Sequence, residues 1–412
     1  MMHKGAIAGL MAATLGMGTI TFAQEAPTPS PTIVATASPT PNTVPIFPSA
    51  EVAARIVAAK PGASVDIGDF DLTKALTLER SVKPEKSPTL LISDDPEYIR
   101  VPEAVALREE VEAGTVRLYV YNVNGVKDPK VPRKISAVIE NLGDKPLKMR
   151  MLHSAFTAPS GNYFEIGKSG LEKFWKSTPQ SSYRQIAVGG AAPIDDGMEE
   201  AIAEYDDLVH GFYEFEISEP ARISVVQTDP KKPSTEAARA IKDVLPVKSV
   251  SGAGRGKFPQ VNFSVKAKID EAKGAQQIII ADGVTDAWIT GTESTTPGVT
   301  ATLKGNYGAM YDIELERKGD GKSLALLMYN QRFGSKWCDA MAASVLIGET
   351  DDEDREVVRV PTDKLNNRSL PEAVVVHVFP PLEKGKREKI HLTYSPPGAS
   401  CLPTPLVFVP VE

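Results

Sequence analysis

Short β-type segments separated by turn residues recur along most of this 412-residue chain. The clearest is Thr115–Val123, in which β-branched and aromatic residues dominate, as is typical of a strand. Residues Lys318–Lys322 contain an Asp-Gly pair, which favours a tight turn. A parallel α/β sheet would need a long helix after each strand, and such helices do not alternate with these segments. The pattern therefore predicts a mostly β protein, with two β-sandwich-like domains and a few short helices.

Three pairs of neighbouring segments are predicted to form hairpins, because turn residues join two β-type runs in each pair. The three are 135–154 with its turn at Leu142–Pro146, His210–Ile217 with Arg222–Thr228 around Glu219-Pro220, and Tyr311–Arg317 with Ser323–Asn330 around Lys318–Lys322. Further strands are expected at Gln276–Ala281, Ala342–Gly348, Glu356–Val360, Ala373–Phe379, Lys389–Tyr394 and Leu406–Val411.

Three segments predict short helices. Glu51–Lys60 is rich in alanine and precedes Pro61-Gly62. Asp195–Leu208 has apolar residues at helical spacing behind two capping aspartates, and Ser234–Leu245 begins with a candidate N-cap serine and ends before a proline.

The segment 246–260 is rich in glycine and lysine and is the best internal boundary. It divides the chain into a first mostly β domain with helical insertions, residues 51–250, and a second β-sandwich-like domain, residues 251–412. No repeat of fixed short period is visible.

Residues 1–23 have the organisation of a secretory signal peptide. A short basic start at Met1–Lys4 precedes the apolar Gly5–Thr21, and small residues allow cleavage before Gln24. A transmembrane anchor is the alternative, but the apolar stretch barely reaches spanning length. The protein is therefore expected to be exported to the periplasm, the cell surface or the extracellular space, with no membrane span after signal cleavage.

Residues 24–50 form a Pro/Thr/Ser-rich linker with almost no charge. Proline fixes φ and lacks an amide hydrogen, so this stretch is expected to be extended and disordered. It is either a stalk that spaces the body from a surface or an unstructured connection, and the composition does not separate the two.

Charge excludes one broad class of partner. The chain has 46 Lys and Arg against 53 Asp and Glu, a net charge of −7, and it has no basic stripe. Phosphate backbones are bound mainly by clustered cations, so no nucleic-acid partner is expected.

The two cysteines, Cys338 and Cys401, both fall in the second β region. An oxidising compartment favours a disulfide between them. Two buried or free thiols are the alternative, because the sequence does not give the distance between them.

Four histidines lie beyond the predicted signal: His153, His210, His377 and His391. None has the H-x-H or H-E-x-x-H spacing of common metal sites. His377 and His391 could lie on neighbouring strands of one sheet, whereas the simpler interpretation is that they are ordinary strand residues. No catalytic, cofactor-binding or metal-binding residue is therefore predicted, and no cofactor. The acidic run Glu349–Asp354 is interpreted as a solvated tip between two strands.

Several stretches resemble an uncharacterised family of exported bacterial proteins, common in cyanobacteria and described as a domain of unknown function. The strongest is Gly305-Asn-Tyr-Gly-Ala-Met-Tyr-Asp-Ile-Glu-Leu315. Val44-Pro-Ile-Phe47, Leu118–Val123 and Val138–Leu147 are also similar. The resemblance covers most of residues 44–412 in scattered short matches. The family has no established activity, so it implies no site residues.

Some members of that family are loosely labelled copper amine oxidase-like. Copper amine oxidases make a quinone from the tyrosine of T-x-x-N-Y-D/E beside three copper-binding histidines. Here Asn306-Tyr307 is present, but Thr302 is one place too far away and Gly308 replaces the acidic residue. The H-x-H pair is also missing, so Tyr307 is interpreted as a structural aromatic residue.

These features predict a non-catalytic exported envelope or surface protein, acting as a binding or structural module whose partner is a cell-envelope polymer or protein. Exposed aromatic rings would be its contact residues, and the tryptophans Trp175, Trp288 and Trp337 are candidates, although tryptophan is usually buried in a core. The alternative, from a different class, is a metal-dependent extracellular enzyme that uses His377 and His391 with a carboxylate.

Overall fold

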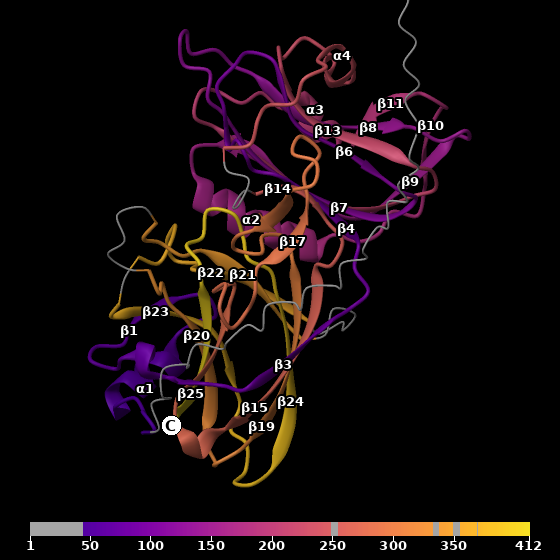
Figure 1. Ribbon diagram of the computed structural model, residues 1–412. Coiled ribbons are helices and arrows are strands. Elements are labelled where there is room, and N and C mark those ends of the chain that lie inside the picture. Colours follow the sequence, from indigo (N-terminus) through magenta and orange to yellow (C-terminus); the bar gives the residue numbers. More distant parts are fainter. Residues whose placement is uncertain (1–43, 249–253, 333–337, 349–354, 369) are drawn as a thin grey trace, which may run out of the picture. The chain divides into compact units, whose positions relative to one another are not determined.

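The computed structural model describes residues 44–248, 254–332, 338–348, 355–368 and 370–412 (Figure 1). Strands dominate this part of the chain, so the mostly β fold class is confirmed. The predicted signal peptide, most of the linker, Trp337 and the acidic run Glu349–Asp354 lie outside the described residues. The α-helices in the described ranges are α1 (Ala50–Ala58), α2 (Tyr163–Lys176), α3 (Asp196–Glu200) and α4 (Ser234–Ala240).

Two of the four sheets found among the described residues come mainly from the first half of the chain. Sheet I has the order β11 (Ala191–Pro193), β8 (Lys134–Asn141), β13 (Ala221–Thr228), β6 (Ala104–Val111). Sheet II has the order β10 (Arg184–Ile186), β9 (Leu147–Ser160), β12 (Leu208–Ile217), β7 (Gly114–Asn124), β4 (Thr89–Ser93), β14 (Arg255–Phe258), β17 (Ile289–Thr292), β18 (Thr300–Leu303), with β5 (Tyr98–Ile99) also on β7.

The other two sheets come mainly from the second half. Sheet III has the order β1 (Ser64–Asp66), β23 (Glu372–Phe379), β20 (Ser323–Met328), β25 (Thr404–Val411), β16 (Gln276–Ile280), β2 (Leu76–Thr77). Sheet IV has the order β22 (Glu356–Val360), β21 (Ala343–Ile347), β24 (Arg387–Tyr394), β19 (Met310–Lys318), β15 (Asn262–Asp270), β3 (Arg80–Pro84).

The three predicted hairpins contain the right strands, but the predicted pairings are wrong. β8 lies in sheet I and β9 in sheet II, β13 and β12 are divided in the same way, and β19 and β20 lie in sheets IV and III. Each tight connection therefore crosses between two sheets instead of joining neighbours within one. Alternation of apolar and polar residues indicates that a segment is a strand, whereas the strand with which it pairs depends on contacts with residues far away in the sequence.

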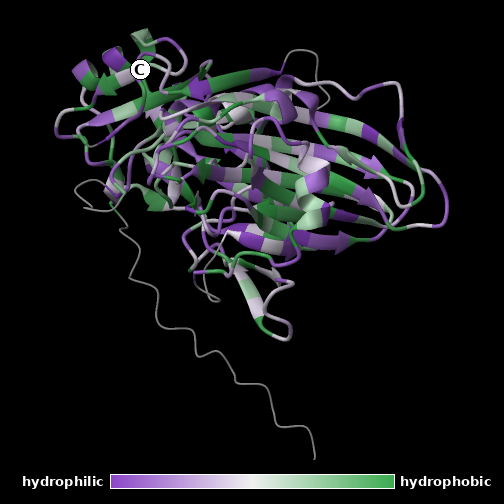
Figure 2. Cartoon of the chain, turned by 90° about the horizontal axis from the view of Figure 1, so that it is seen from above, coloured by the Kyte–Doolittle hydropathy of each residue, from purple (hydrophilic) through white to green (hydrophobic). Residues whose placement is uncertain are grey.

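The strands of sheet II are apolar on both faces because each face of the sheet packs against a different core. Along β7, Val116, Leu118 and Val120 join a core shared with sheet I. The intervening Tyr119 and Tyr121 join a second core, which α2 and sheets III and IV share. Figure 2 shows hydrophobic and hydrophilic residues alternating along many strands. A third core lies between α1 and the other face of sheet III.

Two predicted helices end early because the residues that follow them form β-bridges with distant segments of the chain. After α3, Ala203 forms an isolated antiparallel bridge with Arg133, so the helix stops at Glu200 and not at Leu208. After α4, Val244 bridges to Val105, so the helix stops at Ala240. These long-range backbone hydrogen bonds outweigh the local helix propensity.

Helix α2 was not predicted, and two glycines explain the weak signal. A methyl group on Gly167 would lie 2.3 Å from the carbonyl oxygen of Gly398, and one on Gly170 would lie 2.4 Å from His210 Nε2. Glycine lowers helix propensity, but here it lets the helix approach its neighbours. No helix in the described ranges is both long enough and apolar enough to cross a membrane.

The predicted division at residues 250 and 251 remains a prediction, and the sheets run across it. β14 continues sheet II beside β4, and β3 is an edge strand of sheet IV beside β15. β1 and β2 likewise form the two edges of sheet III. Strands from both sides of the boundary thus share three of the four described sheets.

Candidate functional site

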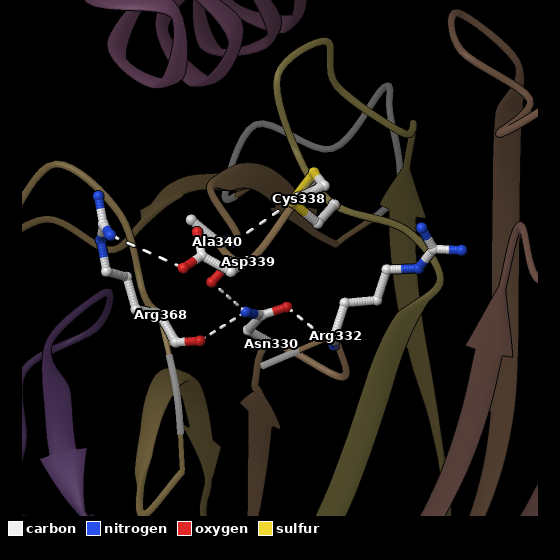
Figure 3. Close-up of a disulfide and its surroundings, with 7 residues drawn as sticks. Asn330, Arg332, Cys338, Asp339, Ala340 and Arg368 are labelled. Carbon is white, nitrogen blue, oxygen red and sulfur yellow. Dashed lines mark hydrogen bonds and ion pairs between the residues drawn. A yellow bond between two sulfur atoms is a disulfide. The ribbon is translucent and has the colours of Figure 1, made fainter. Parts of the chain in front are cut away.

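The predicted disulfide between Cys338 and Cys401 is present, with 5.5 Å between the two Cα atoms (Figure 3). Backbone contacts accompany it: the Cys401 amide donates to the Ala340 carbonyl at 3.0 Å, and the Ala340 amide donates to Cys401 Sγ at 3.3 Å. The buried Asn330 side chain donates to the carbonyls of Asp339 and Arg368. The bridge therefore holds two loops together at the end of sheet III.

The disulfide also lies next to a loop that packs against sheet II. The Gly398 amide donates to the Tyr119 hydroxyl at 2.7 Å. The carbonyl of the same residue lies against Gly167 of α2. Cys401 thus anchors a segment that closes the core between α2 and β7, which is a structural role.

The structure corrects the expected position of two histidines. His377 lies on β23 in sheet III, whereas His391 lies on β24 in sheet IV, so the two are not on neighbouring strands of one sheet. His377 Nδ1 is 3.6 Å from Glu356 Oε2. Within the described ranges, no three His, Cys, Asp or Glu side chains are grouped so that they could hold a metal ion.

The Gly305–Leu315 motif is a tightly bonded turn that leads into β19. Gly305, Asn306 and Gly308 have φ values of 97°, 49° and 74°, a region that favours glycine and asparagine. Asn306 Oδ1 accepts from the Ile289 amide at 3.0 Å, and its Nδ2 donates to the Tyr311 hydroxyl at 2.8 Å. These contacts give the motif a structural role.

The tryptophans give little support to an aromatic contact surface. Trp175 is buried in α2. Trp288 is 37% exposed, but Lys304 Nζ lies 5.5 Å from its ring centroid and Gly283 packs against the indole. Neither ring lines the pocket described next.

The strongest candidate site is an open pocket of about 980 Å³, which we call the charged pocket. It lies between sheet I, helix α4, strand β14 and the loop 293–299 that follows β17. Its lining includes three hydroxyl side chains, those of Thr292, Ser294 and Thr295. Its charged lining residues are Arg108, Glu109, Glu110, Glu140, Arg222, Arg239, Lys242, Lys257 and Glu293.

Four of these charges neutralise one another. Arg222 pairs with Glu110 at 2.8 Å and with Glu140 at 2.9 Å. Arg239 pairs with the other oxygen of Glu140 at 3.3 Å. β13 and its neighbours β6 and β8 bring the first three side chains together, because they occupy the same register row.

Glu293 is neutralised by a residue beneath the pocket. Its Oε1 pairs with Nη2 of the buried Arg255 at 2.9 Å, and Oε2 accepts from Thr295 and Thr296. Burial alone would raise the pKa of Glu293, but the hydrogen bonds from Thr295 and the charge of Arg255 lower it. Glu293 therefore stays ionised and shapes the loop.

Three cations remain, Arg108, Lys242 and Lys257, and in the described part of the chain they donate hydrogen bonds to uncharged groups. Arg108 donates to the carbonyls of Ala238 and Ile241 at the end of α4, at 2.6 and 2.8 Å. Lys257 Nζ donates to the Glu110 carbonyl at 2.9 Å, and Lys242 Nζ donates to the Arg239 carbonyl at 2.9 Å.

One carboxyl group is left to oppose these cations. Glu109 accepts from the Ser294 amide at 2.8 Å, and burial raises its pKa. After the ion pairs are set aside, the pocket carries an excess of positive charge in a chain whose net charge is −7.

The sequence analysis missed the charged pocket. Its residues come from positions 108 to 299 and have no motif spacing. The only local signal was the cluster of charges in Arg108-Glu-Glu110, on a strand that is otherwise apolar.

Comparison with known proteins adds no family. No family model matches the chain, and no curated protein matches it. Weak structural matches include AerE from Microcystis aeruginosa, with 8% identity over 75% of this chain and 99% of that one and a TM-score of 0.11. Vicilin from Capsicum annuum has 9% identity over 74% of each chain and a TM-score of 0.11. An oxalate decarboxylase from Bacillus subtilis has 10% identity over 80% of this chain and 77% of its own, with a TM-score of 0.10. These TM-scores are too low to support any conclusion about function.

Proposed function

We propose that this chain is an exported, non-catalytic envelope or surface module that binds a polar ligand in the charged pocket. The observation that carries the proposal is the pocket itself: it has a volume of about 980 Å³, and three of its lining cations, Arg108, Lys242 and Lys257, donate to backbone carbonyls and not to carboxylates. A pocket with convergent polar groups is the usual place for a ligand.

Binding is favoured over catalysis by the way in which the carboxylates are used. Glu110, Glu140 and Glu293 each pair with a guanidinium. Each of these carboxylates is thus already held in an ion pair within the protein, whereas a general acid or base must be free to exchange a proton with a substrate. These groups are therefore suited to fix the geometry of the pocket.

Export is supported by the organisation of residues 1–23 and by the disulfide, since disulfides persist in oxidising compartments. The Gly305–Leu315 motif supports membership of the uncharacterised exported family that the sequence resembles.

The test is retention of the purified protein on cell-wall and envelope preparations, run beside a broad hydrolase screen. The pocket variant Lys242→Gln/Lys257→Gln removes two ammonium groups and keeps side chains of similar length. The matched control is Lys83→Gln/Lys86→Gln, two exposed lysines that do not line the pocket.

We expect the control to be retained like the wild type and the pocket variant to be washed off. Equal retention of both variants would show that the binding site is not the charged pocket. Turnover of a polymer without retention would favour the enzyme alternative instead.

A further inference from the structure

We propose that the ligand of the charged pocket is an anionic glycan, whose carboxylate or sulfate groups are bound by Arg108, Lys242 and Lys257. This inference rests on the proposed function and names the class of ligand for the same site.

The first argument is the charge that remains after pairing. Arg222 and Arg239 are matched by Glu110 and Glu140, and Glu293 by Arg255. Arg108, Lys242 and Lys257 then face the single carboxyl group of Glu109, whose pKa burial raises. A cleft whose net charge has one sign favours ligands of the opposite sign, even when the whole protein repels them.

The second argument is that the two lysines keep donor capacity, whereas Arg108 already donates to Ser224 and to three backbone carbonyls. An ammonium group has three N–H donors, and the described contacts of Lys242 and Lys257 each use one of them, on a carbonyl. A sulfate or carboxylate group can accept the others without breaking an ion pair. Charge-assisted hydrogen bonds of this kind are roughly twice as strong as neutral ones.

The third argument favours a glycan over an acidic protein. The centres of protein interfaces are enriched in aromatic residues and depleted in Lys and Glu, whereas this pocket has Lys and Glu and no aromatic lining residue. The Thr292 hydroxyl can instead donate to and accept from sugar hydroxyls, and the Ser294 hydroxyl, which donates to the Arg108 carbonyl, can still accept from them.

The experiment measures binding of the full purified protein to four polymers by calorimetry at several salt concentrations: polygalacturonate, dextran sulfate, neutral dextran and poly-glutamate. Monomeric galacturonate is the fifth ligand and separates recognition of a chain from recognition of one anionic sugar. We expect one or both anionic glycans to bind, with an affinity that falls as salt rises, and neutral dextran not to bind.

The Lys242→Gln/Lys257→Gln variant is expected to bind the glycan more weakly by on the order of tenfold or more, and with a weaker salt dependence. Lys83→Gln/Lys86→Gln should bind like the wild type. Circular dichroism of both variants checks that they are folded.

Equal or tighter binding of poly-glutamate would overturn the choice of a glycan. Two results would overturn the proposal that the pocket binds anionic groups. One is binding of neutral dextran alone, and the other is glycan binding that is unchanged in the Lys242→Gln/Lys257→Gln variant. Retention on envelope preparations without binding to either anionic glycan would remove this inference and leave the proposed function standing.

Discussion

Arg117 on β7 donates a hydrogen bond from Nη1 to the carbonyl oxygen of Gly308 at 3.0 Å, although 191 residues separate the two in the chain. The same guanidinium pairs with Glu214 on β12, with 2.7 Å between Nη2 and Oε2. Arg117 is buried in sheet II, and Gly308 has a φ of 74° in the turn before β19. One side chain therefore joins sheet II to the turn of the Gly305–Leu315 motif.

Replacing Arg117 with methionine should lower the free energy of unfolding by about 3 kcal/mol. The change leaves the Glu214 carboxylate and the Gly308 carbonyl without their partner, and losing one member of a buried ion pair typically costs about 3–5 kcal/mol. Urea unfolding monitored by fluorescence measures the change. Arg150→Met is the control, because Arg150 pairs with Glu216 in a more exposed position and its loss should cost under about 1 kcal/mol. Similar losses in the two variants would contradict the structural role of Arg117.

His210 is predicted to make the protein sensitive to acid. The side chain is buried against Tyr119 and Tyr121, and its Nδ1 lies 2.8 Å from the Val120 carbonyl. Burial lowers the pKa of His210 to about 4. The unfolded chain binds a proton near pH 6.5, so the stability that neutral His210 provides is complete above that pH and is lost as pH falls toward 4.

The expected loss from this one group is about 3 kcal/mol between pH 7 and pH 4. His210→Gln keeps an amide donor for Val120 but does not titrate, so its stability should fall less over the same range. Denaturant unfolding at several pH values gives the difference between the two proteins. Parallel pH profiles for the wild type and the variant would show that His210 is accessible to protons in the folded state.

Removal of the disulfide should destabilise the protein by about 4 kcal/mol in the chain-entropy model, because the bridge closes a loop with a sequence separation of 63. The double variant Cys338→Ser/Cys401→Ser, compared with the oxidised wild type in thermal unfolding, measures this loss. Peptide mapping of exported protein without reductant should recover the two cysteines in one linked pair. Recovery of both as free thiols would contradict the bridge.

The sequence predicted strands far better than it predicted their partners. Leu147–Ser154 and His210–Ile217 were expected to pair within two separate hairpins, but β9 and β12 pair with each other in sheet II. Alternation is a property of neighbouring residues, whereas the partner is chosen by burial on both faces of a sheet. The charged pocket could not be predicted from the sequence for the same reason, because Arg108 and Lys257 lie on strands of different sheets and line one pocket only in the folded chain.

Helix α2 shows how a tertiary contact can hide a local signal, and it gives the last prediction. Gly167→Ala should raise the helix propensity of the segment and yet lower the free energy of unfolding by about 1–3 kcal/mol. The new methyl group would lie 2.3 Å from the carbonyl oxygen of Gly398, and that backbone is held by the Tyr119 hydroxyl and by the nearby disulfide. The neighbouring Gly161→Ala is the control, because a methyl group there meets no atom within 4 Å and should change stability by less than about 0.5 kcal/mol. If Gly167→Ala proved as stable as Gly161→Ala in urea unfolding, the close packing of α2 on the 395–403 loop would be wrong.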